Sequence, residues 1–557
     1  MFFVWYCRRL MDYKKLSAIL SPNISKTVSD WESVYPKRNL KEGAFVTRFA
    51  PSPTGFIHIG GIYTAVAEER LAHQSGGVYI LRIEDTDKNR EKDNGVNEIV
   101  DSLAQFGLVH DEGVFNNGEE KGEYGPYMQS NRLDIYHSFA KHLVSIGRAY
   151  PSFATSEELD AIRKEQESSK VKPGYYGVWA KDRELSIEEV EDKIKNGVPY
   201  VIRLKSLGVE SPRQFHDEVK GTISVPLNDQ DSILLKSDGY PTYHFAHVVD
   251  DYLMGTTHVI RADEWLSSLP LHIELFEAFG FSLPKFGHLS PIMKLDGTKR
   301  KLSKRKDPEA SVSYYIEHGY PSVAVIEYVL NLLNSSFEDW RKDNPTLSYT
   351  EFPVRLDKMS VSGALMDIVK LNDISKNIIG AMTAEELYEN TLKWAKVYDM
   401  DFSQRLETQK DYTLEVLGIE RGGENPRKDF AMYSEIKAGI SYMYDDLYDR
   451  DAVASVLDSL LTKEKVTEIV HTFGVHEIHA TNKDEWFEEM KSVAGTLGYA
   501  PDGKTFKANP ENYKGSIADV AMVLRVALTG RTKTPDMFAL MKVLGFKRAQ
   551  ERFASYA

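Results

Sequence analysis

The chain has 557 residues, of which 42% are hydrophobic and 27% are charged, and its formal net charge is −14. These globular values exclude a fibrous or disordered protein, and the single cysteine, Cys7, excludes an internal disulfide and any site that needs two cysteine ligands. The acidic charge argues against a nonspecific nucleic-acid coat, but it is compatible with nucleic-acid binding at local basic patches.

The N-terminal segment is apolar but short. Met1 to Cys7 precede Arg8 and Arg9, whereas a secretory signal places its charge before a longer apolar run. No stretch approaches the ~18 apolar residues that a transmembrane helix needs. We therefore expect a cytoplasmic protein without membrane contact. Met11 is an alternative start, and residues 1–43 are expected to form a helical appendage.

A strand, a rigid turn and a helix are predicted next. Ala44 to Phe49 are typical of a short buried strand, and the two prolines that follow forbid a helix in the turn. From Ile59 the apolar positions recur at helical spacing. The Gly60-Gly61 pair allows a ligand to approach the backbone closely. Because the N–H groups of a helix start attract anions, a phosphate is expected beside His58.

Strands and helices then alternate, which predicts a parallel sheet. Val78 to Ile83 are expected to form a strand and Val96 to Phe106 a helix. Strands of the same sheet are expected to resume near Ser232 to Leu235 and Thr257 to Arg261. Between the two halves lies an insertion of roughly residues 128–230, long enough to be a domain with its own ligand.

A basic stretch from Lys294 to Lys306 holds seven cations and one acid in this acidic chain. Asp296-Gly297 marks a turn, so the cations are expected on or beside a loop. A mobile loop of lysines can neutralise the charge that develops on a departing pyrophosphate. Taken alone, such a run is more often a solvated loop. From Asp307 to the end of the chain the pattern is mostly helical.

Two motifs together carry a family resemblance. His58-Ile-Gly-Gly61 resembles the HIGH signature of class I aminoacyl-tRNA synthetases, and Lys301-Leu-Ser-Lys-Arg305 resembles their KMSKS signature. The family signature often ends in a second histidine, where this chain has Gly61. From about residue 44 onward, the chain more closely resembles the bacterial-type glutamyl-tRNA synthetases. Further motifs that carry this resemblance are Arg48 to Gly55, Ile83 to Asp87, Gly125 to Ser130, Ser237 to His244, Val248 to Gly255, Ile260 to Trp265 and Arg525 to Gly530.

The resemblance implies an α/β fold. A Rossmann-like parallel sheet would form the catalytic domain, with an inserted α+β connective domain, and all-α C-terminal domains would follow. The expected parts are the appendage (1–43), the first half of the Rossmann domain (44–127), the inserted domain for the tRNA acceptor end (128–230), the second half of the Rossmann domain (231–305), a helical region that contacts the tRNA stem (306–385) and a helical anticodon-binding domain (386–557).

The resemblance also implies two-step chemistry. L-Glutamate would react with ATP to give glutamyl-adenylate and pyrophosphate, and the acyl group would pass to the 3′ end of tRNA(Glu), releasing AMP. Whether tRNA(Gln) is also charged stays open. Mg²⁺ is expected with ATP, without a dedicated protein cage. No zinc is expected, because the insertion lacks the cysteines that bind it in some relatives. A monomer is expected.

Arginine forms bidentate pairs with carboxylates, so two arginines suit a substrate with two carboxylates. Arg48 and Arg261 end two predicted strands, and ligands of open α/β sheets bind at the carboxyl ends of strands. The resemblance assigns glutamate binding to Arg48, Ser52, Glu84, Tyr243, His247 and Arg261, with Glu84 facing the ammonium group and His247 standing where relatives often have asparagine.

The remaining assignments also follow the resemblance. ATP binding is assigned to His58, Gly60, Gly61, Lys301, Ser303 and Lys304, of which His58, Lys301 and Lys304 are expected to be catalytic. Contact with tRNA is assigned to Asp87, Trp265 and Arg525, although packing is an equal alternative for Trp265 and is open for Arg525. No residue is assigned to a metal.

Four alternatives share part of this pattern. A small-molecule nucleotidyltransferase shares the His-Gly turn, but it would not need so long a helical tail. A glutaminyl-tRNA synthetase typically has Pro-Glu-Pro-Asn in place of Pro51 to Thr54, and its C-terminal half is β-rich, whereas helical periodicity continues here after residue 386. A truncated paralogue that glutamylates a modified tRNA base lacks the anticodon half, whereas about 250 residues follow the basic loop here. A non-catalytic tRNA-binding paralogue is expected to lose His58, Lys301 or Lys304, and this chain keeps all three.

Overall fold

The computed structural model describes residues 11–54, 57–87, 92, 94–208, 211–303, 305–423 and 425–557. Two compact units are present: unit 1 comprises Met1–Tyr314 and Ile326–Met366, and unit 2 comprises Tyr315–Val325 and Asp367–Ala557. Cys7 and the predicted catalytic residue Lys304 lie outside the described residues. In the described part of the chain, no helix has the length and apolar character to cross a membrane. The finer domain bounds stay predictions.

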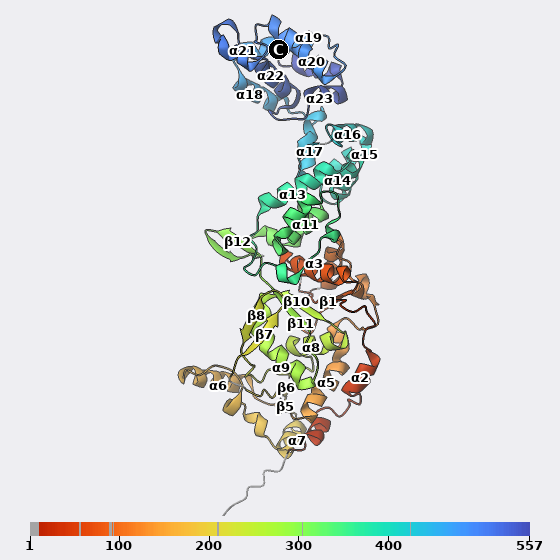
Figure 1. The fold of residues 1–557 in the computed structure, drawn as a ribbon, viewed down its shortest axis with the longest axis vertical. Helices are drawn as coiled ribbons and strands as arrows, with labels where there is room; N and C mark the ends of the chain where they lie inside the picture. Colours follow the sequence, from red (N-terminus) through yellow and green to blue (C-terminus); the bar gives the residue numbers. More distant parts are fainter. Residues whose placement is uncertain are drawn as a thin grey trace, which may run out of the picture. The chain divides into compact units, whose positions relative to one another are not determined.

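A mainly parallel sheet lies at the centre of unit 1 (Figure 1). Its strands are β1 (Val46–Phe49), β2 (Val78–Leu81), β3 (Glu112–Val114) and the antiparallel edge strand β4 (Glu120–Lys121), with the parallel pair β10 (His258–Ala262) and β11 (Lys285–Leu289) alongside. β10 lies next to β1, where the N–H of Thr257 donates to the carbonyl of Val46 at 3.0 Å. The predicted Rossmann-like parallel sheet is therefore confirmed.

Helices cover this sheet, and the longest of them follows β1 directly. The helices are α3 (Ile59–Gln74), α4 (Gly95–Gln105), α8 (Tyr243–Leu253) and α9 (Leu269–Phe279). α3 begins at His58, whose Nδ1 accepts a hydrogen bond from the N–H of Gly60 at 2.9 Å. Even charged residues of α3 are buried, among them Glu68. Because a buried charge needs a partner, α3 is held by polar contacts as well as by apolar packing.

The insertion forms a small sheet and a two-stranded hairpin. The antiparallel sheet has the order β5 (Ala149–Ser152), β6 (Val201–Leu204) and β9 (Ile233–Leu235), and the hairpin joins β7 (Arg213–Asp217) to β8 (Gly221–Val225). The prediction that Ser232 to Leu235 belong to the parallel sheet was wrong, because β9 pairs with β6. A three-residue apolar strand carries no local signal for its partner, so only tertiary pairing decides it.

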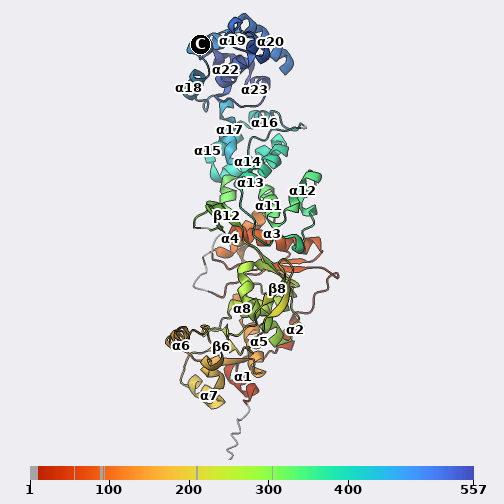
Figure 2. The same cartoon turned by 60° about the vertical axis from the view of Figure 1, so that its left-hand side comes forward.

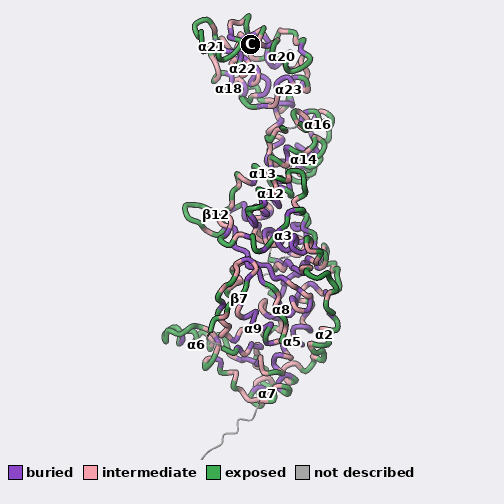
Figure 3. The backbone as a smooth tube through the Cα atoms, viewed as in Figure 1, coloured by how far each residue is buried: buried purple, intermediate pink, exposed green. Residues whose placement is uncertain are grey.

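Helices flank the insertion sheet. They are α5 (Leu133–Ser145), α6 (Ser156–Ser168) and α7 (Ile187–Lys195). A reciprocal capping box between Thr155 and Glu158 starts α6. α6 projects from the body of unit 1 in Figures 1 and 2, and Figure 3 shows it exposed along most of its length. Gln166 is its one fully buried residue, and Leu159 and Ile162 pack against a small cluster that includes Tyr150 and Tyr175. Capping therefore adds to a limited apolar contact.

The N-terminal segment adds two short helices to unit 1. They are α1 (Tyr13–Leu20), which packs against α5, and α2 (Val28–Val34). The guanidinium of Arg38 anchors the following segment by donating two hydrogen bonds to the Glu112 carboxylate at 2.7 and 2.8 Å. A bidentate pair of this kind fixes geometry as well as charge.

Unit 2 is all-helical over its described residues, which confirms the predicted helical C-terminal half. Its helices after residue 367 are α13 (Ile368–Ala381), α14 (Ala384–Tyr398), α15 (Met400–Thr408), α16 (Lys410–Gly418), α17 (Ser434–Ile440), α18 (Arg450–Leu460), α19 (Lys463–Val475), α20 (Lys483–Thr496), α21 (Gly503–Ala508), α22 (Ile517–Thr529), α23 (Met537–Leu544) and α24 (Phe546–Ala554). α22 is the most buried of these and packs against α18, α19 and α24.

Candidate active site

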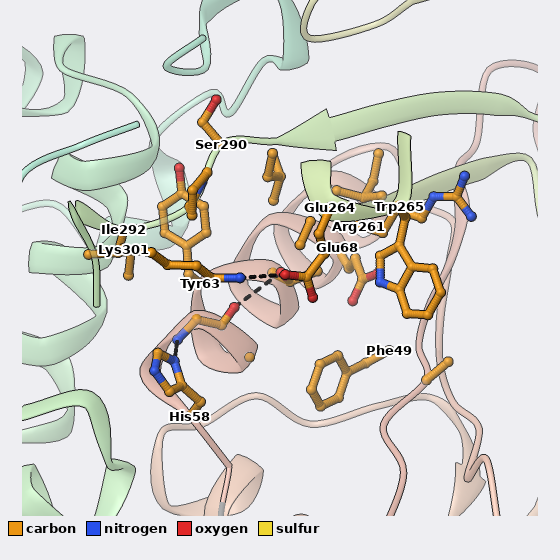
Figure 4. Close-up of a pocket in the computed structure, with 18 of the residues that line it drawn as sticks. Phe49, His58, Tyr63, Glu68, Arg261, Glu264, Trp265, Ser290, Ile292 and Lys301 are labelled. Atoms are coloured by element: carbon orange, nitrogen blue, oxygen red, sulfur yellow. Dashed lines mark hydrogen bonds and ion pairs between the residues drawn. The ribbon is translucent and has the colours of Figure 1, made fainter. Parts of the chain in front are cut away.

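A cavity of about 370 Å³ opens beside the carboxyl ends of β1 and β10 (Figure 4). Nine of the residues predicted from the sequence line it: Arg48, His58, Gly60, Gly61, Glu84, Tyr243, Arg261, Trp265 and Lys301. They come from β1, the start of α3, the segment after β2, α8, β10, the short 3-10 helix η5 (Asp263–Ser268) and β13 (Thr298–Lys301). The carboxyl edge of the sheet therefore gathers residues that lie more than 250 positions apart.

The start of α3 forms one end of the cavity. His58 caps the helix, and its ring lies against the backbone of Gly60 (Figure 4). Gly61 packs closely: a Cβ at this position would lie 2.7 Å from Cγ2 of Ile57. This crowding gives a physical reason for glycine where the family signature often has histidine. A helix start attracts anions, but here the N–H of Gly60 already donates to His58 and that of Gly61 to the His58 carbonyl.

Replacing Gly61 by alanine should lower the free energy of unfolding by about 1–2 kcal/mol, because the clash with Ile57 outweighs the gain in helix propensity. Gly495→Ala in α20 is the control, since a Cβ added there would meet no atom within 4 Å and a small gain of about 0.5–1 kcal/mol is expected. Chemical denaturation of both variants measures the difference. Equal effects at the two positions would contradict the packing argument.

The basic stretch forms a hairpin at another wall of the cavity. β12 (Met293–Asp296) pairs with β13, and Gly297 turns between them with φ +69°, a left-handed conformation that favours glycine. The Lys301 ammonium contacts the Glu264 carboxylate across the cavity (Figure 4). The N–H of Ser303 donates to Asp307 at 2.9 Å, and Ser303 does not line the cavity.

Arg261 is a buried cation whose hydrogen bonds go to neutral groups. Its Nε donates to Nε2 of His288 at 3.0 Å, and its Nη1 donates to Nδ1 of His272 at 2.9 Å. Nη2 is buried and makes no hydrogen bond to any described residue. Burial lowers the pKa of the Arg261 guanidinium, although an arginine stays charged in proteins. This guanidinium is therefore suited to an anionic ligand.

Arg48 has a different environment from Arg261. Its Nε donates to both oxygens of Asp251 at 3.1 Å, and its Nη1 lies 3.5 Å from Oε1 of Glu68. Burial by itself raises the pKa of the Glu68 carboxyl, which stays well above its ordinary value despite Arg48. Two carboxyl groups from the chain thus already meet Arg48 at the base of the cavity.

Glu84 lines the cavity near a buried arginine, with Arg82 Nη2 at 3.4 Å from its Oε1. Burial raises the pKa of Glu84 to about 7, against the opposing effect of Arg82 and Arg48. The carboxyl group is therefore poised to change its charge near neutral pH.

If Glu84 binds an ammonium group, glutamate affinity should fall as the pH drops below about 7, because protonation removes the negative charge of the free site. The same rise in pKa makes folding more favourable below pH 7, so lost affinity would not reflect unfolding. The KM for glutamate between pH 5.5 and 8.5 measures the effect. Glu84→Gln should raise this KM and flatten its pH dependence, whereas a dependence that survives the substitution must come from another group.

Aromatic rings form a further wall. The rings of Tyr243 and Trp265 have centroids 4.4 Å apart, and the His247 ring stacks on Tyr243 with a centroid distance of 5.7 Å. Burial lowers the pKa of His247 to about 3, so the ring is neutral, and its Nδ1 lies 2.7 Å from Oδ2 of Asp251. His247 does not itself line the cavity. Its contact with the site is through the stacked ring of Tyr243.

Three predicted residues lie elsewhere. Ser52 and Asp87 belong to unit 1, but both are exposed and neither lines the cavity. Arg525 lies on α22 in unit 2, where its Nη1 donates to Oγ1 of Thr534 at 2.9 Å. This bond is compatible with a packing role, and contact of these three residues with tRNA or substrate stays a prediction.

Two family models match this chain, and one of them covers all the residues that line the cavity. Residues 44–343 match the family model described as tRNA synthetases class I (E and Q), catalytic domain, and residues 504–557 match an anticodon binding domain. The chain belongs to the class I tRNA synthetases of the glutamate and glutamine type.

Individual relatives lie within this family. The chain is 49% identical over 98% of its length to a glutamate–tRNA ligase of Clostridium perfringens, all of which is covered. It is 48% identical over 97% of its length to one from Acetivibrio thermocellus, of which 99% is covered. A crystal structure of a glutamate tRNA ligase from Elizabethkingia meningosepticum in complex with its amino acid has a TM-score of 0.71 at 28% identity, covering 92% of this chain and 99% of that one.

Several residues that shape the site in this member of the family were not predicted from the sequence. Glu68 and Glu264 line the cavity, and Asp251, His272 and His288 hold the arginines. Asp251 and Glu264 fall inside motifs that carried the resemblance, which was the available signal for them. No sequence signal marked His272 or His288, because a lone histidine is usually a core residue. In the described residues, no three His, Cys, Asp or Glu side chains converge as a metal site.

Proposed function

We propose that this chain is a glutamate–tRNA ligase that activates L-glutamate with ATP and transfers it to the 3′ end of tRNA(Glu). The observation that carries the choice of substrate is Arg261, a buried guanidinium bonded to two neutral histidines with Nη2 left for an anion. A second candidate, glutamine, would offer a neutral amide in place of the side-chain carboxylate. A buried cation without a carboxylate partner favours the charged substrate.

The glutamate end of the cavity would work by charge matching. Arg261 would take a substrate carboxylate through Nη2, and Glu84, when ionised, would face the substrate ammonium group. Tyr243 would close the pocket from the α8 side, with His247 packed behind it. Arg48, already paired with Asp251, would add positive charge at the base of the cavity. Ser52 would meet the substrate only if its exposed turn closed over the cavity.

The phosphate end would stabilise charge rather than form bonds. A carboxylate oxygen of glutamate would attack the α-phosphorus of ATP, and the bond to the departing pyrophosphate would break. His58, Gly60 and Gly61 would face the phosphates from the start of α3, and the N–H of Gly60 would have to exchange Nδ1 of His58 for a phosphate oxygen. Lys301 would approach from the end of β13, and Ser303 and Lys304, which follow it in the sequence, are proposed to act with it. Lys301 would have to exchange Glu264 for phosphate oxygens, because the two side chains are in contact without ATP.

The second step would need no covalent enzyme intermediate. A hydroxyl of the terminal ribose would attack the acyl carbon of glutamyl-adenylate and lose its proton, and AMP would leave. Mg²⁺ would arrive with ATP and neutralise phosphate charge. Glu264 fits a water-mediated contact with it, since its carboxylate is half-exposed at the cavity wall.

Contact with tRNA would extend over both units. The insertion would hold the acceptor end near Asp87 and Trp265, and the helical unit, which includes the matched anticodon binding domain, would contact the anticodon. Arg525 would serve there either by binding RNA or by packing. We expect a monomer that acts in the cytoplasm. Whether tRNA(Gln) is a second substrate is decided by the same experiment that tests the function.

Aminoacylation of purified tRNA(Glu) and tRNA(Gln), measured side by side with glutamate and with glutamine, tests this proposal. Glutamate is expected to be attached to tRNA(Glu), and ATP–pyrophosphate exchange should depend on glutamate. Exchange that responds to glutamine but not to glutamate would overturn the assignment. Charging of tRNA(Gln) with glutamate would add a substrate without changing the reaction.

A further inference from the structure

A chain of buried hydrogen bonds runs from the Arg261 guanidinium to a hairpin of the insertion. Arginine has donors and no acceptor, so both histidines that it contacts must offer a lone pair. His288 accepts at Nε2 and His272 accepts at Nδ1. A neutral imidazole carries its proton on the other nitrogen, which places the proton of His288 on Nδ1 and that of His272 on Nε2.

The next link of the chain is Asp217, the last residue of β7. Nδ1 of His288 lies 2.6 Å from Oδ2 of Asp217, so the His288 proton is donated to this carboxylate. The other oxygen, Oδ1, accepts from the N–H of Val219 at 3.0 Å and of Lys220 at 2.8 Å, both in the turn that leads into β8. Asp217 and His288 are each 0% exposed. Both oxygens of the Asp217 carboxylate therefore accept hydrogen bonds from groups of this chain.

The second branch of the chain ends in α8. Nε2 of His272 lies 2.9 Å from Nδ1 of His244, and the tautomer imposed by Arg261 makes His272 the donor. Burial lowers the pKa of His272 and of His288, which keeps both rings neutral and their lone pairs available to the guanidinium. Two neutral rings thus hold one cation from two sides.

We propose that Asp217 and His288 are positioning residues for Arg261, so that the β7–β8 hairpin of the insertion sets the orientation of the guanidinium that binds a glutamate carboxylate. This inference rests on the proposed function. Neither residue lines the cavity, so neither would touch the substrate. They would act on glutamate binding by fixing the tautomer of His288. Only a His288 ring with its proton on Nδ1 offers Nε2 as an acceptor to Arg261.

The isosteric variant Asp217→Asn tests this directly. An asparagine whose amide NH₂ faces His288 would force the ring proton onto Nε2, where it opposes the Nε–H of Arg261. An asparagine turned the other way would point its NH₂ at the N–H groups of Val219 and Lys220. Either orientation sets donors against each other: the first breaks the hydrogen bond between His288 and Arg261, and the second breaks the bonds that hold residue 217 to the hairpin turn.

We expect Asp217→Asn to raise the KM for glutamate about 10- to 100-fold, as for the loss of one hydrogen bond to a charged group, with the KM for ATP unchanged within about twofold. Asp231→Asn is the matched control. Asp231 is equally buried in the insertion and pairs with Arg183, but it has no link to Arg261. It should lower thermal stability and leave both KM values unchanged.

A second pair of variants keeps the test decisive if Asp217→Asn does not fold. His288→Gln can place an amide oxygen near the position of Nε2 and its NH₂ toward Asp217, so it should retain most glutamate binding, whereas His288→Leu should lose it. The increase in melting temperature caused by glutamate, and separately by ATP, is measured for each variant. This readout does not require turnover.

Each outcome bears on a different claim. Selective loss of the glutamate response in Asp217→Asn and His288→Leu, with His288→Gln close to wild type, supports the positioning role. Equal loss of the glutamate and ATP responses, or a loss that Asp231→Asn shares, would overturn it and indicate a structural role only. A wild-type protein that responds to ATP but not to glutamate would instead overturn the proposed function, and the inference with it.

Discussion

Arg261→Gln is expected to weaken glutamate binding by about 100-fold or more, equivalent to about 3 kcal/mol, while the fold stays intact. The physical reason is that the guanidinium is buried without a carboxylate of its own, so the substrate would supply the missing charge. Removing it from the free protein also removes a desolvation cost. The melting temperature should therefore stay the same or rise, which is unusual for a substitution in a buried site.

Arg203→Gln is the matched control for this prediction. Arg203 is buried in β6, burial likewise lowers the pKa of its guanidinium, and its Nη1 donates to the backbone carbonyl of Asp231 at 2.9 Å. It lies outside the cavity. Glutamate binding, measured by calorimetry, should be unchanged in this variant. Equal losses in Arg203→Gln and Arg261→Gln would show that a buried arginine matters for folding rather than for the ligand.

Asp251→Asn is expected to destabilise unit 1 by about 3–5 kcal/mol, because it leaves two buried guanidiniums without their shared partner. Oδ1 of Asp251 accepts from Nη1 of Arg82 at 2.6 Å, and both its oxygens accept from Arg48. The carboxylate also lies beside His247. Denaturant unfolding measures the loss. Asp229→Asn, at an exposed pair with Lys172, should cost no more than about 1 kcal/mol.

The stability lost in Asp251→Asn should depend on pH in a definite direction. Burial by itself raises the pKa of the Asp251 carboxyl, but Arg48 and Arg82 hold it well below its ordinary value. A lowered carboxyl pKa contributes stability above the unfolded value of about 3.9, and this contribution is lost as the pH falls through the folded value. The difference between wild type and Asp251→Asn should be full at pH 7 and shrink below about pH 4. A difference that grows in acid would contradict the assignment of charge.

Two arginines that looked equivalent in the sequence illustrate what residue type and position can predict. Both Arg48 and Arg261 were expected at the carboxyl edge of the sheet, and both line the cavity. The sequence could place them because strand ends follow from local apolar patterns. It could not separate their partners. The Asp251 carboxylate of α8 pairs with Arg48, which also lies near Glu68 of α3, whereas Arg261 meets histidines.

The strand β9 illustrates the opposite case. Its residues were recognised as a strand, since a short β-branched and leucine-rich run is a local signal. Its partner was mistaken, because pairing with β6 depends on how the insertion closes on itself. A turn was predicted at Asp296-Gly297, and the structure has it there, between β12 and β13. This prediction was possible because the Asp-Gly dipeptide is a local turn signal.

The sequence by itself determined the elements whose causes are local: the buried strand before the turn, the helix that starts at His58, the glycine turn of the basic hairpin and the long helical C-terminal half. Its motifs also determined the family. Only the tertiary structure decided the charge state of the site, because pKa shifts and hydrogen-bond partners arise between residues far apart in the chain. The tautomer chain from Asp217 to Arg261 joins residues 44 positions apart, and no local pattern encodes it.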